Sequence, residues 1–376
     1  MSQVPPDLYP NILSRVFAES LLRFRCVCKA WCRIIDNPTF IKLHLHRQSD
    51  RGQLILSDDA GSMIYSLSLD SLNRYSTGTV VVASPLKTSI RCDVPRVYTV
   101  PVTSCKGLIL IYRYPDQFAL WNPFTREAHF LPSYTPTVLS NQRVCSSNSS
   151  LGYDSVTDDY KVVIIVKCYN QTWGETLVYS LKSNSWRRVK GCPYIPLYWG
   201  PGVFANGVVH WFTGRYVKDR LIVAFDLATE DYYTLPLPSI LSKPRRHSPN
   251  PLLDALGECL VLTWYDSVYR LEDYGGEKLW TKLFSISGIG LREVRPITYL
   301  NTKREVLLWV RAADTTFEYF WFDIETKIAK KFRIAGAQDK PYSRVCLPSL
   351  VRLCDIGSVD ESIAGKGTSG RKRKGY

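Results

Sequence analysis

"FALWNPFTREAHFLP", residues 118–132, is the stretch that decides the fold of this chain of 376 residues. It reads as an apolar and aromatic strand, a polar turn and a second strand. Similar phrases are "LVYSLKSNSWRRV" (177–189), "VAFDLATEDYYTLPLP" (223–238) and "YFWFDIETKIAKKFRI" (319–334). Looser copies are "MIYSLSLDSLNRYS" (63–76) and "VYRLEDYGGEKLWTKLFSI" (268–286). A hairpin that recurs in this way predicts a repetitive β fold.

One aromatic residue can be aligned in every copy, and these residues lie 44 to 58 positions apart. They are Tyr65, Trp121, Tyr179, Phe225, Tyr269 and Phe322. Each hairpin follows an apolar run such as "KGLILIY" (106–112), and another candidate strand precedes all but the first of these runs. Four strands in about fifty residues are typical of propeller blades. The sequence therefore predicts a mainly β protein with a six-bladed β-propeller over 52–354.

The first and last repeats are incomplete in complementary ways. The first lacks a leading strand, because a helical segment ends just before "GQLILS" (52–57). The last is followed by a spare candidate strand, "SRVCLPSLVRL" (343–353). We predict that this segment completes the first blade, because closing the ring removes free sheet edges. The final residues, 355–376, are polar and Gly/Ser-rich, so we expect a disordered basic tail.

The first fifty residues show a helical period instead. Apolar residues follow "VPPD" at three-to-four-residue spacing, a second helix is predicted from about Ser20 to Ile35, and a third from about Pro38. Three short helices over 3–46 cannot bury their apolar residues among themselves. We therefore expect an exposed hydrophobic patch that a partner protein covers.

Several other classes of function fit the sequence poorly. The net charge of +14 is spread without a dense basic stripe, so we expect a solvated basic surface and no nucleic acid partner. No apolar run is long enough for a membrane span. Cys26, Cys28 and Cys32 match no common zinc spacing, and we expect no metal and no cofactor. Phosphate-loop, nucleophile-elbow and metalloprotease motifs are missing, so we expect no enzyme, with His210 a structural residue in a strand.

Residues 4–45, "VPPDLYPNILSRVFAESLLRFRCVCKAWCRIIDNPTFIKLHL", resemble the F-box of plant proteins along its whole length. The hairpins, with "CKGLILI", "LGYDSVTDDYKVVIIV" and "NGVVHWF", resemble the F-box-associated interaction domain, a kelch-like propeller. The resemblance implies a three-helix F-box that docks on a Skp-type adaptor and, through a cullin scaffold, joins an SCF-type ubiquitin ligase. The chain departs from the F-box pattern at Val4, which replaces the family's opening Leu, and at Val16-Phe17 and Glu19, where the family has Leu-Pro and Lys. The missing proline predicts a weaker break between the first two helices.

The propeller, by the same resemblance, recruits a protein client for ubiquitination and degradation. The chain looks most like members that restrain plant immune signalling by marking immune receptors. Pollen self-incompatibility receptors share the architecture, and a propeller binding module without a ligase role is a further alternative. "RKRK" (371–374) would suit nuclear import or a solvated end, so both cytoplasm and nucleus stay open.

Two sets of site residues follow. The adaptor-binding set is Val4, Pro5, Leu8, Ile12, Leu13, Leu22, Val27, Cys28 and Trp31. The client-binding set is placed on long loops, because long loops on a rigid scaffold concentrate binding residues. Loops 190–201 and 236–251 would share one end of the propeller, and the F-box would enter at the other. This second set comprises Tyr194, Tyr198, Trp199, Arg245, Arg246 and His247, chosen because aromatic and Arg side chains dominate binding energetics.

Overall fold

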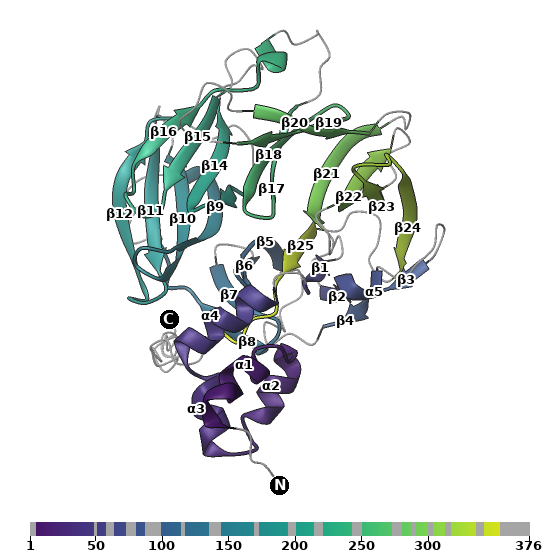
Figure 1. Cartoon of the computed structure of the whole chain (residues 1–376). Helices are drawn as coiled ribbons and strands as arrows, with labels where there is room; N and C mark the ends of the chain where they lie inside the picture. The colour runs from purple at the N-terminus through teal and green to yellow at the C-terminus, as the bar shows by residue number, and fades with distance from the viewer. Residues whose placement is uncertain are drawn as a thin grey trace, which may run out of the picture.

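The computed structural model joins a small helical unit to a β-propeller (Figure 1). It describes residues 5–48, 51–57, 64–72, 80–86, 99–113, 117–134, 144–168, 173–194, 201–213, 221–242, 250–272, 280–286, 291–299, 304–312, 317–335 and 342–353. The predicted tail, 355–376, lies outside these residues.

The helical unit contains four α-helices after a short 3-10 turn, η1 (Pro6–Leu8). They are α1 (Tyr9–Leu13), α2 (Ala18–Phe24), α3 (Lys29–Ile35) and α4 (Pro38–Arg47). Pro10 lies in the first turn of α1, where a missing N–H donor is tolerated. The Asn37 side chain caps α4 by accepting from the N–H groups of Thr39 and Phe40.

The prediction of one second helix is wrong, because the chain breaks between α2 and α3. Cys28 is extended (φ −160°, ψ 160°) and its sulfur accepts a 3.5 Å contact from the Trp31 N–H at the start of α3. The apolar stripe continues through the break, so its period did not reveal it. The break before α2 forms without proline, since Phe17 adopts an extended ψ of 145°.

The propeller has six sheets, which confirms the predicted fold. The strands of the first two blades are β25 (Tyr342–Cys346), β1 (Gln53–Ser57), β2 (Ile64–Ser68) and β4 (Ser84–Pro85), then β5 (Thr99–Cys105), β6 (Leu108–Arg113), β7 (Gln117–Asn122) and β8 (Glu127–Phe130). Blades 3 and 4 contain β9 (Val144–Asp154), β10 (Asp159–Cys168), β11 (Gly174–Ser180), β12 (Ser185–Cys192), β13 (Val203–Ala205), β14 (Val208–Thr213), β15 (Leu221–Asp226) and β16 (Tyr232–Leu235).

Blade 5 contains β17 (Leu252–Leu256), β18 (Cys259–Trp264), β19 (Ser267–Leu271) and β20 (Trp280–Ser285). Blade 6 contains β21 (Leu291–Tyr299), β22 (Glu305–Ala312), β23 (Phe317–Asp323), β24 (Ala329–Ala335) and the added strand β3 (Val80–Val82). Two short helices lie in connections, α5 (Leu69–Leu72) and η3 (Ser239–Ser242).

Blades 1 and 6 exchange strands in both directions. The inner strand of blade 1 is β25, which pairs antiparallel with β1 from Gln53↔Cys346 to Ser57↔Tyr342, as predicted for ring closure. At the rim, β3 leaves blade 1 and pairs in parallel with β24 of blade 6. This second exchange was not predicted. Together the two strands join the start and the end of the propeller at its centre and at its edge.

The repeated hairpins form as the sequence indicated. Four of the aligned aromatic residues are the largest fully buried side chains of the described residues: Trp121, Tyr179, Phe225 and Phe322. Tyr65 and Tyr269 are only half-buried, and a bulge lies between Val268 and Tyr269. The buried aromatic residues therefore fill the cores of four blades, while the two looser copies use other residues.

The C-terminal segment, defined here as residues 347–353, continues from β25 onto blade 2. Its carbonyl groups at Ser349 and Val351 accept hydrogen bonds of 3.1 and 2.8 Å from Asn122 Nδ2. The Leu353 N–H donates to Glu127 at 2.7 Å. Gly107 lies so close that a Cβ there would come within 2.2 Å of Ser349 Cβ. The segment is thus packed tightly against blade 2.

Candidate functional site

The exposed face of the helical unit carries most of the predicted adaptor-binding residues. Val27 is 62% exposed, Leu8 48% and Ile12 49%, and Pro5 and Cys28 are also exposed. Leu22 and Trp31 are half-buried. Leu13 corrects the prediction, because it is 3% exposed and belongs to the hydrophobic core. Val4 lies outside the described residues.

Aromatic side chains that pack against one another hold this face of the helical unit in place. The Trp31 ring lies 5.4 Å from Phe24 and 6.2 Å from Tyr9, measured between ring centroids. Arg25 donates two hydrogen bonds, of 2.6 and 2.8 Å, to the Asp36 carboxylate and so ties the end of α2 to the end of α3. The face is therefore a packed surface, and Val27 is not covered by the propeller.

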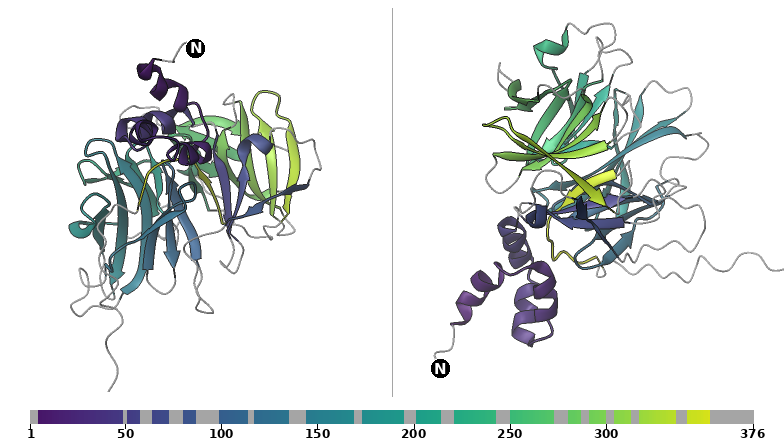
Figure 2. Two further views of the ribbon diagram at one scale, coloured as in Figure 1. Left: turned by 90° about the horizontal axis from the view of Figure 1, so that it is seen from below. Right: turned by 90° about the vertical axis from the view of Figure 1, so that its right-hand side faces the viewer.

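The helical unit is anchored to one end of the propeller (Figure 2). We call this the short-turn end, because it holds the short connections inside the blades, such as those at 106–107 and 123–126. One hydrophobic cluster runs from Leu21, Ile35 and Phe40 of the helices to Ile109 and Trp121 of blade 2. Because no polar layer separates them, the two parts share one core.

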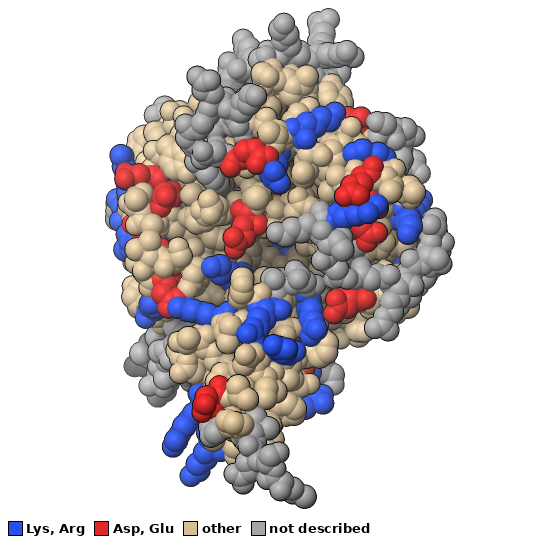
Figure 3. Space-filling view, in the orientation of Figure 1, with Lys and Arg blue, Asp and Glu red and all other residues tan. Residues whose placement is uncertain are grey.

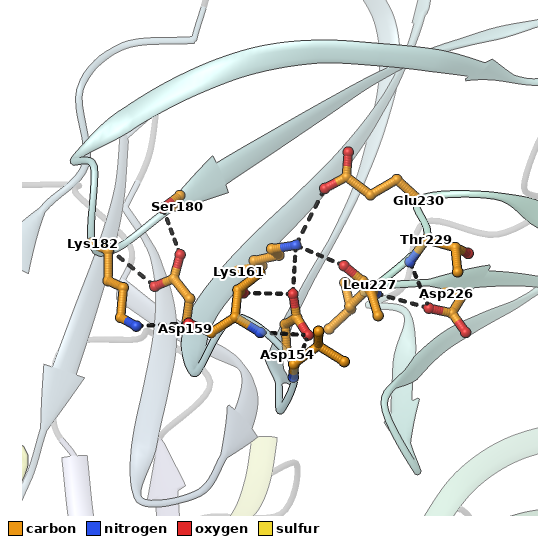
Figure 4. Close-up of polar contacts among 12 residues, drawn as sticks. Asp154, Asp159, Lys161, Ser180, Lys182, Asp226, Leu227, Thr229 and Glu230 are labelled. Atoms are coloured by element: carbon orange, nitrogen blue, oxygen red, sulfur yellow. Dashed lines mark hydrogen bonds and ion pairs between the residues drawn. The ribbon is translucent and has the colours of Figure 1, made fainter. Parts of the chain in front are cut away.

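Charged residues complete this junction. Lys42 of α4 pairs at 2.7 Å with Asp158, which lies in the turn between β9 and β10. In blade 3, which contains this turn, the ammonium group of Lys161 is buried (Figure 4). It lies 2.8 Å from Asp154, 3.3 Å from Glu230 and 2.7 Å from the Leu227 carbonyl oxygen. Since Leu227 and Glu230 belong to blade 4, this network fixes adjacent turns on the side that faces α4.

The opposite, long-loop end carries the connections between blades and between second and third strands. Exposed large apolar side chains gather there along blades 2 to 5 of the described chain: Phe130, Trp173, Tyr194, Leu221, Ile240 and Tyr265. On the propeller's short-turn end, the described exposed apolar residues are Val156 and Ile328. Val80 and Val82 are exposed on the edge strand β3, and most of the other exposed apolar side chains of the described propeller lie on the end away from the helices.

Blade 3 contributes two neighbouring aromatic residues to the long-loop end. Trp173 is 43% exposed and precedes β11, while Tyr194 is 38% exposed and follows β12. The Trp173 ring can lie close to β12 because residue 191 is glycine: a Cβ at Gly191 would lie 3.0 Å from the ring. Of the predicted client-binding residues, Tyr194 is exposed at this end, whereas Tyr198, Trp199, Arg245, Arg246 and His247 lie outside the described residues. Trp173 was missed, although "QTWGE" (171–175) is a turn-like phrase between two predicted strands.

Possible chemical centres are sparse in the described part of the chain. No group of three His, Cys, Asp or Glu side chains there could hold a metal ion. His210 is fully buried, and burial lowers its pKa to about 4, so it stays neutral and packed at ordinary pH. The described helices include none that is long and apolar enough to cross a bilayer.

Comparison with known proteins assigns both parts of the chain. A model of the F-box domain matches residues 1–43, and a model of the F-box associated beta propeller domain matches residues 54–351. The F-box protein CPR1 of Arabidopsis thaliana is 30% identical over 96% of this chain and 92% of its own length. An F-box/kelch-repeat protein of the same plant is 26% identical, over 82% and 86%.

Among solved structures, a mutant of AofleA from Arthrobotrys oligospora is similar, with 10% identity, a TM-score of 0.44, and coverage of 80% of this chain and 91% of that one. This likeness is distant. The two domain matches together span nearly the whole sequence, in the order in which the helices and blades occur. This chain belongs to the family of F-box proteins that carry an F-box associated β-propeller domain.

Proposed function

We propose that this protein is the substrate-recognition subunit of an SCF-type ubiquitin ligase. The F-box implies binding to a Skp-type adaptor, and family members of this architecture are non-catalytic receptors. The observation that supports the proposal most is the separation of two exposed apolar surfaces. One lies on the F-box around Ile12 and Val27, and the other on the long-loop end around Trp173 and Tyr194. A receptor that holds two partners at once needs such separation.

The F-box surface would bind the adaptor by hydrophobic burial. Exposed apolar patches of this kind mark protein interaction sites. Burying one large aliphatic side chain contributes about 1.5–3 kcal/mol, so two charged substitutions there should weaken binding severely. The client would then be held near the conjugating enzyme, which raises the local concentration of its lysine residues.

Adaptor binding is tested by co-purification. The double variant Ile12→Asp, Val27→Asp should recover at least tenfold less Skp-type adaptor than the parent chain. Ile328→Asp is the matched control, because Ile328 is equally exposed but lies in a propeller turn. If the double variant recovered as much adaptor as Ile328→Asp, this face would not be the adaptor site.

Client binding is tested separately. The double variant Trp173→Ala, Tyr194→Ala should lose ubiquitinated clients while it keeps the adaptor, and the same test extends to Tyr198 and Arg246. Clients would be captured by affinity purification from plant cells with the proteasome blocked. We infer an immune receptor as the first client class to examine, from the resemblance to immune-regulating members; a pollen self-incompatibility role predicts clients restricted to pollen and pistil. If these variants recovered as much client as the parent chain, the long-loop end would not be the client-binding site.

A further inference from the structure

The inner strands of the propeller enclose a cavity of about 1500 Å³. Its walls come from β5, β13, β17, β21 and β25, and His46 of α4 lies at its rim. Figure 3 shows a hollow near the middle of the propeller on the face seen in Figure 1, with acidic and basic side chains around it. Ligand pockets typically measure roughly 300–1,000 Å³, so the space is sufficient for a small molecule.

Three neighbouring inner strands each direct one charged side chain to the cavity wall. They carry Asp254 on β17, Arg295 on β21 and Arg344 on β25. Arg295 Nη1 lies 3.7 Å from Asp254 Oδ1, and Arg295 Nε donates to Glu293 at 3.0 Å. Arg344 Nε donates to the Val102 carbonyl oxygen at 2.8 Å. Both guanidinium groups are thus held in place by the strands around the cavity.

The Asp254 carboxylate has an unusual environment for a structural residue. Its Oδ2 atom is buried and has no hydrogen-bond partner in the described part of the chain. Burial raises the pKa of Asp254 to about 6, although the charges of Arg295 and Arg344 oppose the shift. An unsatisfied buried acceptor costs about 1–3 kcal/mol, and such groups are rare in native proteins. Ionisable groups with perturbed pKa values are concentrated at functional sites.

We propose that this cavity binds a small hydroxy acid or amino acid. Its carboxylate would lie against Arg295 and Arg344, and its hydroxyl or ammonium group would donate to the Asp254 carboxylate, whose side chain is 20% exposed. Two guanidinium groups beside one acceptor match an anionic group with an adjacent donor, and guanidinium pairs well with carboxylate. The site lies between the F-box and the long-loop end and is independent of the adaptor and client surfaces.

The experiment uses the purified full chain with L-malate and L-glutamate as separate probes. Saturation-transfer difference NMR and calorimetric titration should show saturable binding of at least one probe. Asp254→Asn and Arg344→Gln should each raise its Kd at least tenfold. Asp231→Asn makes the same change of charge on an exposed residue in the turn between β15 and β16, which does not line the cavity, and this control should leave the Kd unchanged.

The thermal unfolding of each variant establishes that it is folded, and Arg344→Lys provides a milder substitution that keeps the charge but loses the planar donor pair. The proposal is overturned if neither probe binds the parent chain. It is also overturned if Asp254→Asn and both Arg344 variants bind as the parent does.

Discussion

Polar residues directly after the buried aromatic residues close the hairpins of several blades. Asp226 Oδ1 accepts hydrogen bonds of 2.8 and 3.0 Å from the N–H groups of Ala228 and Thr229, and Asp323 caps its own turn in the same way. Asn122 occupies the equivalent position in blade 2 but is fully buried. Its Oδ1 caps the turn while its Nδ2 binds the C-terminal segment. One repeat position therefore has different importance in different blades.

This difference predicts unequal effects of the same substitution. Asn122→Ala should lower the free energy of unfolding by about 3 kcal/mol, because buried donors and acceptors lose their partners. Asp226→Ala should lower it by about 1 kcal/mol, since water replaces the lost bonds at an exposed turn. Urea unfolding of both variants checks this. Equal losses would mean that the bonds from Asn122 to the C-terminal segment contribute nothing.

Burial of His210 predicts a pH dependence of stability. Its pKa is about 4 in the folded protein and near 6.5 in the unfolded chain, so below pH 6.5 only the unfolded chain takes up the proton. Stability should fall by about 3 kcal/mol as the pH drops from 6.5 to 4. Asp254 acts in the opposite direction between pH 6 and 3.8, because its folded pKa is raised. The comparison of variant with parent removes that contribution.

His210→Asn retains a donor for the Val203 carbonyl oxygen but cannot titrate. Melting temperatures at pH 7 and pH 5 should therefore differ less for this variant than for the parent chain. A parent-like difference between the two pH values would show that His210 does not govern the acid response.

At the scale of elements, the C-terminal segment is as important as the strand that precedes it. Leu350 packs in the core shared with the F-box, and Leu353 packs between blades 2 and 3. Both are buried, and each contributes about 1.5–3 kcal/mol through hydrophobic burial. Ring closure thus depends on β25 and also on the residues that follow it.

Two truncations separate these contributions. A chain that ends after Leu353 should unfold at the parental temperature. A chain that ends after Cys346 keeps β25 but loses the C-terminal segment, and its free energy of unfolding should fall by about 5 kcal/mol. Thermal unfolding of the two chains provides the measurement. The assignment fails if the shorter chain is as stable as the longer one.

The elements also show what the sequence could and could not predict. The hairpins were predictable because Trp121 and Phe225 recur with the same polar turn after them. The break at Cys28 was not, because Leu21, Cys28 and Trp31 fit a helical stripe across it. The pairing of β3 with β24 was missed because a short valine run carries no signal for a partner about 250 positions away. Local period predicts elements, whereas long-range pairing depends on the assembled fold.

At the scale of the whole molecule, the F-box and the propeller share one hydrophobic core. Leu21 and Phe40 share a hydrophobic cluster with Ile109 and Trp121, and the exposed Lys42–Asp158 pair lies at the margin of this contact. Hydrophobic burial dominates such junctions, while exposed ion pairs contribute about 0–1 kcal/mol. The orientation of the long-loop end relative to the F-box therefore follows from shared packing.

This arrangement predicts a single cooperative transition in calorimetry of the full chain. Deletion of residues 1–47 should lower the melting temperature of the propeller, because it exposes Ile109 and Trp121. Lys42→Ala should change the stability by less than about 1 kcal/mol. Two separate transitions, or a propeller that melts normally without the helices, would contradict a shared core.

The two candidate sites differ in how far they were predictable. The exposure of Leu8, Ile12 and Val27 agrees with the sequence pattern, because they stand in a motif that covers the whole helical unit, while their binding of an adaptor stays a prediction. Leu13 was misplaced, since helical spacing alone does not tell the inner side of a five-residue helix from the outer. On the propeller, exposure of Trp173 depends on how two loops meet, which no local pattern records.

The late arrival of β25 has a consequence for protein synthesis. The F-box leaves the ribosome first, whereas blade 1 stays open until the last strand is made. A prematurely terminated product would therefore carry the F-box helices beside an unclosed ring with unpaired strand edges. If the F-box face binds the adaptor as proposed, such fragments would compete for the adaptor without presenting a client, and their rapid removal would matter to a cell that makes this protein.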